Sequence, residues 1–159
     1  MGERYLKSLR LLAECLQGFE RYSSDTAREC GLTHAQFDII ATLGNTPGMM
    51  YKELGEKTLI TKGTLTGVIE RLEQKGLVAR ERSCADKRSF FVRLTPQGER
   101  MFDYAFPRMV AMGRELFTAY SEADFDALDQ PLRKLKQRLA EHGADQDVCP
   151  TSLQHKETH

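Results

Sequence analysis

The spacing of apolar residues changes from a helical to a strand period after residue 76, and that change limits the folds open to the chain. Residues 62–75 carry apolar side chains at the three- and four-residue steps of an amphipathic helix, namely Leu65, Val68, Ile69 and Leu72. Residues 77–83 (LVARERS) and 90–94 (FFVRL) are instead short β-rich runs on either side of a charged segment. The sequence therefore predicts a helix followed at once by a β-hairpin with a charged tip.

Helical periodicity dominates the rest of the chain. We expect helices over residues 5–29, 34–45, 51–59, 61–76, 96–119 and from 121 onward, with a minimal strand at 49–50. Thr33 and Ser121 are typical N-caps, and Gly31 and Gly76 suit the left-handed conformation that follows a helix end. The predicted fold class is mainly α with a small β-hairpin wing, in which a winged helix-turn-helix core is joined to N- and C-terminal helices.

Apolar stripes on the terminal helices indicate the domain organisation. The stripes within residues 5–19 and 128–139 are too extensive for a small core to cover, so we expect them to join two copies of the chain. The expected parts are an N-terminal dimerisation helix (1–32), a DNA-binding core (33–95), C-terminal dimerisation helices (96–142) and a disordered tail (143–159). The tail contains almost no apolar residues.

The helix over residues 62–75 carries the strongest functional signal. The face opposite its apolar stripe contains Lys62, Gly63, Thr64, Thr66, Gly67, Glu70, Arg71 and Gln74. Two glycines on an exposed helix face cost about 0.8–1 kcal/mol each relative to alanine, and a face pressed against another molecule has a use for them. Hydroxyls and a lysine at the helix start suit phosphate, and Arg71 suits a base edge. The alternative is a plain amphipathic helix with two accidental glycines.

The hairpin is basic, and its position after two short helices is the order of a winged helix-turn-helix. Its cationic residues are Arg80, Arg82, Lys87, Arg88 and Arg93. Such a wing can reach along the DNA backbone into a minor groove while the second helix of the motif enters the major groove. The alternative is a solvated hairpin whose charges only maintain solubility.

The distribution of charge supports an anionic partner for the middle of the chain. Overall, 23 Lys or Arg residues balance 23 Asp or Glu residues among the 159. Residues 50–100 nevertheless carry 11 basic and 7 acidic side chains, whereas both flanking segments are mildly acidic.

The segment GTLTGVIERLEQKGLVARERSCADKRSFFVRLTPQG resembles the DNA-binding core of the MarR family of bacterial transcription regulators. The matching motifs are the helix end RLEQKGLV, the wing tip Asp86-Lys87-Arg88 and the exit VRLTPQG. The resemblance implies a cytoplasmic, homodimeric regulator of double-stranded DNA with a pseudo-palindromic operator. It also implies that Arg88 enters the minor groove, that Asp86 fixes the wing tip, and that Thr64, Thr66 and Arg71 lie on the recognition helix.

The resemblance also implies control by a small aromatic or phenolic ligand that releases a repressor from its operator. It places a pocket where the first, second and fifth helices meet, for which Cys15, Phe37, Phe106 and Met109 are candidate wall residues. Arg10 is a candidate partner for the charge of the ligand. The alternative for the wall residues is an ordinary structural role in the core.

The cysteines leave a second mode of control open, a thiol-based redox-sensing repressor of the same fold. Cys15, Cys30 and Cys84 are the candidates. Cys15 falls on or beside the apolar stripe of the first helix, where a cysteine commonly acts as a small hydrophobe. Cys84 lies at the wing tip near basic side chains, which favour the reactive thiolate.

Other classes of function have little support in the sequence. There is no G-x-S-x-G motif, Gly-rich phosphate loop or His-containing triad pattern, so we expect neither an enzyme nor a cofactor. The histidines and cysteines lack the spacing of a metal site, and no apolar run approaches the length of a membrane span. The remaining rival is a helical interaction protein that does not bind DNA.

Overall fold

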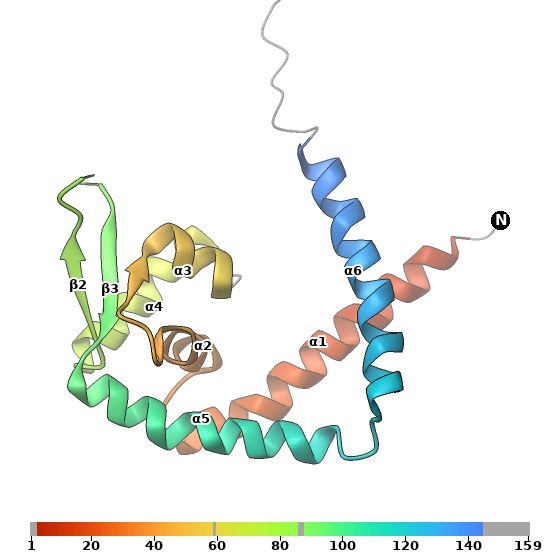
Figure 1. Ribbon diagram of the computed structural model, residues 1–159, viewed down its shortest axis with the longest axis horizontal. Coiled ribbons are helices and arrows are strands. Elements are labelled where there is room, and N and C mark those ends of the chain that lie inside the picture. Colours follow the sequence, from red (N-terminus) through yellow and green to blue (C-terminus); the bar gives the residue numbers. More distant parts are fainter. Residues whose placement is uncertain (1–2, 59, 86–87, 145–159) are drawn as a thin grey trace, which may run out of the picture. The chain divides into compact units, whose positions relative to one another are not determined.

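The computed structural model describes residues 3–58, 60–85 and 88–144 and divides the chain into two compact units at Leu116/Phe117. The first unit contains helices α1 (Arg4–Glu29), α2 (His34–Leu43), α3 (Tyr51–Thr58), α4 (Lys62–Gln74) and α5 (Pro96–Leu116). It also contains strands β1 (Met49–Met50), β2 (Val78–Arg82) and β3 (Phe90–Leu94). The described part of the second unit is built on helix α6 (Glu122–Ala144). Mainly helical structure with one small sheet confirms the predicted fold class (Figure 1).

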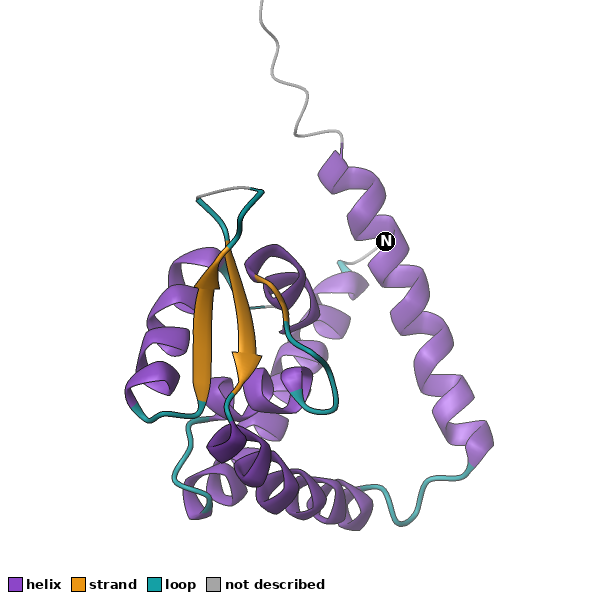
Figure 2. Ribbon diagram, turned by 60° about the vertical axis from the view of Figure 1, so that its left-hand side comes forward, coloured by secondary structure: helices purple, strands orange, loops and turns teal. Residues whose placement is uncertain are grey.

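The three strands form one antiparallel sheet in the order β1-β3-β2. Val78 pairs with Leu94 at the base of the β2–β3 hairpin, and Arg82 pairs with Phe90 near its tip. The two-residue strand β1 adds a short third edge, with Met49 opposite Val92. The hairpin tip points away from α5, so the wing projects from the helical part of its unit (Figure 2).

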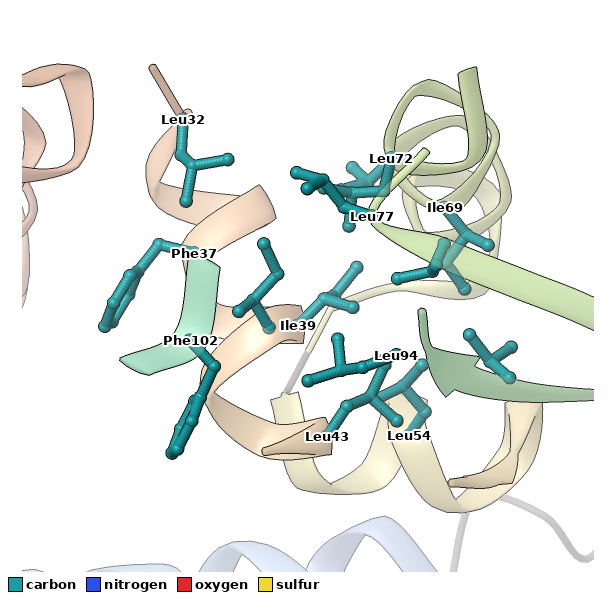
Figure 3. Close-up of a cluster of buried hydrophobic side chains, with 14 of the residues drawn as sticks. Leu32, Phe37, Ile39, Leu43, Leu54, Ile69, Leu72, Leu77, Leu94 and Phe102 are labelled. Carbon is teal, nitrogen blue, oxygen red and sulfur yellow. The ribbon is translucent and has the colours of Figure 1, made fainter. Parts of the chain in front are cut away.

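One hydrophobic core holds α2, α3, α4 and the sheet together. Figure 3 shows side chains from these elements converging, among them Ile39 and Leu43 of α2, Leu54 of α3 and Ile69 of α4. Phe102 from α5 closes one side of the cluster. Because this core fixes α4 by its apolar face, the opposite face is left to solvent.

Local signals set the helix ends. The Thr33 side chain accepts a hydrogen bond from the Gln36 backbone N–H, and the Gln36 side chain accepts one from the Thr33 backbone N–H. This capping box confirms the predicted start of α2. Gly31 and Gly76 have φ of +72° and +74°, which confirms the left-handed conformation expected after α1 and α4.

Helices α2 and α5 end earlier than predicted. Helix α2 ends at Leu43 rather than 45, since Asn45 has a φ of +56° that no helix continues through. Helix α5 ends at Leu116 rather than near 119, where Phe117, Tyr120 and Phe125 pack together instead. His34, in the first turn of α2, is half-buried and hydrogen-bonded to the buried Ser23, with Nδ1 and Oγ 2.9 Å apart.

The apolar stripe of α1 is exposed in the single chain. It consists of Tyr5, Leu9, Leu12, Leu16 and Phe19, each at least 40% exposed. On α6, Leu128, Leu132 and Leu139 are exposed as well. Apolar surface of this extent on a helix ordinarily marks a contact with another molecule.

Candidate nucleic-acid interface

Helix α4 has one buried and one exposed face. Leu65, Val68, Ile69 and Leu72 are all nearly inaccessible to solvent. The exposed residues of the other face are Gly63, Thr64, Thr66, Glu70, Arg71 and Gln74, and Gly67 lies half-exposed among them. Lys62 begins the helix, and its side chain lies outside the described part of the chain. The structure therefore brings the predicted recognition-helix residues together on one face.

The two glycines on this face have no packing role within the chain. A Cβ built at Gly63 or Gly67 meets no other part of the described chain within 4 Å. At Gly98, by contrast, a Cβ would overlap the Leu77 carbonyl oxygen, and at Gly44 it would overlap the Phe102 ring. Internal packing thus explains Gly44 and Gly98, whereas Gly63 and Gly67 leave a shallow surface on α4 that only a second molecule could use.

The start of α4 has no side-chain cap on its backbone. The Thr61 hydroxyl donates to the hydroxyl of Thr64, at 3.2 Å, and makes no hydrogen bond to a backbone N–H of the helix. The N-terminal turn therefore presents backbone donors and hydroxyl groups together at the positive end of the helix dipole. That combination suits a phosphate oxygen.

The arginines of the wing differ in their surroundings. Arg80 and Arg93 are held by acids of the same chain: Arg80 by Glu73, and Arg93 by Glu81 at 3.1 Å. Arg82 and Arg88 are exposed, and the guanidinium of Arg82 lies 5.8 Å from the centre of the Phe90 ring. The remaining predicted wing residues, Asp86 and Lys87, lie outside the described residues.

Sequence reasoning missed the role of Arg80. It grouped Arg80 with the cationic residues of the hairpin, whereas the structure turns its side chain towards α4, α3 and β3. The available signal was the pair Glu70 and Glu73, which are one turn apart on α4 and directly precede the strand that carries Arg80. Opposite charges on adjacent elements commonly pair in this way.

The three redox candidates occupy different environments. Cys15 and Cys84 are exposed in the single chain, whereas Cys30 is buried. Cys15 therefore does not occupy the core as a small hydrophobe within the chain. Burial raises the pKa of the Cys30 thiol, the nearby Arg108 lowers it, and Glu29 raises it, with a net upward shift. A raised pKa keeps Cys30 a thiol at neutral pH, which disfavours reaction with oxidants.

Three of the predicted pocket residues lie in or against the core, and two are exposed on α1. Phe37 is buried in the core, Met109 packs against the core, and Phe106 stacks on Phe102 with ring centres 4.9 Å apart. Cys15 is exposed on α1, and so is Arg10, which pairs with Glu14 at 2.8 Å.

An open cleft of about 440 Å³ lies between α1 and α5. It is lined by Tyr22, Asp25, Thr26, Glu29, Arg108, Ala111, Met112 and Glu115, and it contains none of the five predicted pocket residues.

Among residues 3–58, 60–85 and 88–144, no group of three or more His, Cys, Asp or Glu side chains could hold a metal ion. No helix in that part of the chain is both long and apolar enough to cross a membrane.

Comparison with known proteins assigns this arrangement to a family. The MarR family model matches residues 32–90, which run from the end of α1 into the wing. HosA, a transcriptional regulator of Escherichia coli, is 34% identical over 104 residues, covering 65% of this chain and 77% of HosA. The homoprotocatechuate degradative operon repressor of Escherichia coli is 27% identical over 131 residues, covering 81% of this chain and 85% of the repressor.

A solved structure agrees with the sequence relatives. BpsR of Bordetella bronchiseptica, whose DNA binding is regulated by 6-hydroxynicotinic acid, matches with a TM-score of 0.72 and 28% identity, covering 82% of this chain and 98% of BpsR. All of these proteins are regulators rather than enzymes. Together with the order of helices α3 and α4 and the β2–β3 wing, these likenesses show that the chain is a transcription regulator of the MarR family.

Proposed function

We propose that the protein is a homodimeric repressor that binds a pseudo-palindromic DNA duplex and leaves it when a small aromatic ligand binds. Each copy would insert the exposed face of α4 into the major groove and place its wing against the backbone and the adjoining minor groove. Residues 33–95 form the DNA-binding part of this proposal, and the terminal helices join the two copies. A regulator of chromosomal DNA works in the bacterial cytoplasm.

The observation that carries the DNA-binding proposal is the exposed face of α4. It combines two glycines without an internal packing role, hydroxyls at the helix start and the exposed Arg71. Glycine lets the helix approach the groove closely, hydroxyls suit phosphate, and an arginine can contact guanine through two hydrogen bonds. The two glycines on a surface that met only water would lower helix stability without any gain.

The homodimer and the ligand rest on separate grounds. The exposed stripe of α1 supports self-association, because a symmetric pair of chains would remove it from water. The ligand class is taken from two of the named relatives. One is a homoprotocatechuate degradative operon repressor, and the DNA binding of the other is regulated by 6-hydroxynicotinic acid. A ligand that favours one spacing of the two α4 helices over another needs only a few kcal/mol of differential affinity to release DNA.

Substitution of Arg88 tests the proposed contact of the wing. The probe is a duplex enriched from a random-sequence pool by the wild-type protein, and affinity is measured by fluorescence anisotropy. Arg88→Ala should weaken binding by about 1–3 kcal/mol if its groove contact is a good one, and leave the thermal midpoint unchanged. Arg28→Ala, which removes an exposed arginine at the end of α1, is the matched control and should bind normally. Unchanged affinity of Arg88→Ala would remove this residue from the interface.

Two further measurements distinguish the proposed function from its alternatives. Affinity that falls steeply with salt supports DNA binding through phosphates, whereas the absence of any duplex binding favours a helical interaction protein. Titration of the complex with phenolic acids, and separately with peroxide before and after a thiol reductant, distinguishes the two modes of control. Release by oxidant alone, reversed by the reductant, would replace the ligand with a cysteine switch.

A further inference from the structure

We propose that Arg80 is a positioning residue that fixes the wing relative to the recognition helix, through an ion pair with Glu73. The inference rests on the proposed DNA-binding function and deepens it, because both surfaces must fit one duplex at the same time. Arg80 itself touches no DNA in this proposal.

The contacts of Arg80 with α4 are directional. Its Nε donates to Glu73 Oε2 at 2.9 Å, and its Nη2 lies 2.8 Å from the same oxygen. Glu70, one turn earlier, lies 3.8 Å from Nη1. The side chain of Arg80 is only 22% exposed, so solvent screens this pair less than it screens a pair on the open surface.

The remaining sides of the guanidinium contact two other elements. Nη1 donates to the Tyr51 hydroxyl of α3 at 3.4 Å. The guanidinium carbon lies 5.3 Å from the centre of the Phe90 ring at the start of β3, and the Tyr51 ring lies 5.5 Å from that ring. One side chain of β2 thus contacts the other strand of the wing, β3, and two helices outside the wing, α3 and α4.

The location of Arg80 suits control of the wing angle. It lies in the middle of β2, between the buried base at Val78 and the exposed end at Arg82. The covalent link from α4 to β2 is a short turn through Gly76, and Arg80 adds side-chain contacts to α4 further along the hairpin, beyond that turn. An interface that is already arranged before binding loses less free energy when it orders on DNA.

Because Glu73 is negatively charged, electrostatics and the positioning role predict opposite effects of its neutralisation on DNA affinity. Electrostatics alone predicts that removing a carboxylate beside the DNA-binding surface strengthens binding. The positioning role predicts the opposite for Glu73→Gln, a loss of about three- to fivefold, the range expected for a partly exposed ion pair. The matched control is Glu81→Gln, which removes the carboxylate that pairs with Arg93 within the hairpin. It should leave affinity unchanged or slightly raised.

The experiment pairs DNA affinity with a measurement on the free protein. Affinity for the enriched duplex is measured by anisotropy, and backbone hydrogen exchange of β2 and β3 is measured without DNA. Glu73→Gln should weaken binding and speed exchange in the wing, whereas Glu81→Gln should weaken nothing. Arg80→Lys, which keeps the charge but loses the planar fork, should lose affinity too and serves as the second variant if Glu73→Gln unfolds.

The results distinguish failure of the Arg80 proposal from failure of the proposed DNA-binding function. Unchanged or tighter binding by Glu73→Gln overturns the proposal, and so does weaker binding with wild-type exchange in the wing. If the wild-type protein binds no duplex, the proposed function fails instead, while hydrogen exchange still reports whether Arg80 and Glu73 hold the wing.

Discussion

Gly67 lies among exposed side chains on α4 and has room for a Cβ on every side within the chain. At a residue of this kind, the requirements of helix stability and of function differ. Alanine is the better helix former, so the protein keeps glycine at a cost to its own folding. The surface that results is shallow enough for the helix backbone to approach another molecule.

Gly67→Ala should therefore change two properties in opposite directions. The free energy of unfolding should rise by up to about 1 kcal/mol, from the helix propensity of alanine. Affinity for the enriched duplex should fall, because the added methyl group lies between α4 and the groove. Chemical denaturation and anisotropy measure the two effects.

Gly18→Ala is the control for this substitution. Gly18 is in α1, away from its apolar stripe, and a Cβ there also meets nothing within 4 Å. It should stabilise the protein similarly and leave DNA affinity as it was. A Gly67→Ala variant that binds DNA as tightly as the wild type would show that the glycine face is not the contact.

At the scale of elements, the packing of α5 against the hairpin holds the base of the wing. Gly98 in the first turns of α5 lies directly against the Leu77 carbonyl, and Thr95 donates its backbone N–H to the same oxygen at 3.1 Å. The Thr95 hydroxyl also donates to the Gly76 carbonyl, at 2.6 Å. The segment that leads into β2 and the segment that leaves β3 are thus joined at one point.

Gly98→Ala should be destabilising by about 1–3 kcal/mol, the usual cost of forcing extra volume into a packed site. The reason is that the overlapping atom belongs to the backbone and cannot move aside as a side chain would. Gly113→Ala in the same helix is the control, since its Cβ has open space and should be neutral or stabilising. Equal thermal midpoints for the two variants would contradict this account.

Periodicity and capping signals predict most of the elements, and they fail where the packing of particular side chains decides. Thr33 and Gly31 act locally, so the boundary between α1 and α2 could be read from the sequence. The end of α5 could not, because Phe117 turns out of the helix to pack with Tyr120 and Phe125. Likewise the α4 face follows from helical spacing, but the orientation of Arg80 depends on two acids and a tyrosine from other elements.

At the scale of the whole molecule, the exposed stripe of α1 is the main unsatisfied surface. Leu16 is 60% exposed, and four further apolar residues continue the stripe along the helix. A protein that bound DNA as a single chain would expose this surface to water permanently. Self-association is the simplest arrangement that buries it.

Leu16→Glu should weaken or abolish the proposed homodimer, because it would place a charge within an apolar contact. Light scattering at micromolar concentration should report a mass near that of one chain, and affinity for a pseudo-palindromic duplex should fall. Gln17→Glu adds the same charge beside the stripe and should remain dimeric. Wild-type protein that is already monomeric under these conditions would rule out the dimer itself.

The stripe also links folding to abundance. When two chains associate through it, the folded state gains stability by mass action, so the thermal midpoint should rise with protein concentration. Below the dissociation constant, the amount of dimer falls with the square of the number of chains. A cell that halves its copies would then lose about three quarters of its dimers, and the regulated gene would respond more steeply than the regulator itself changes.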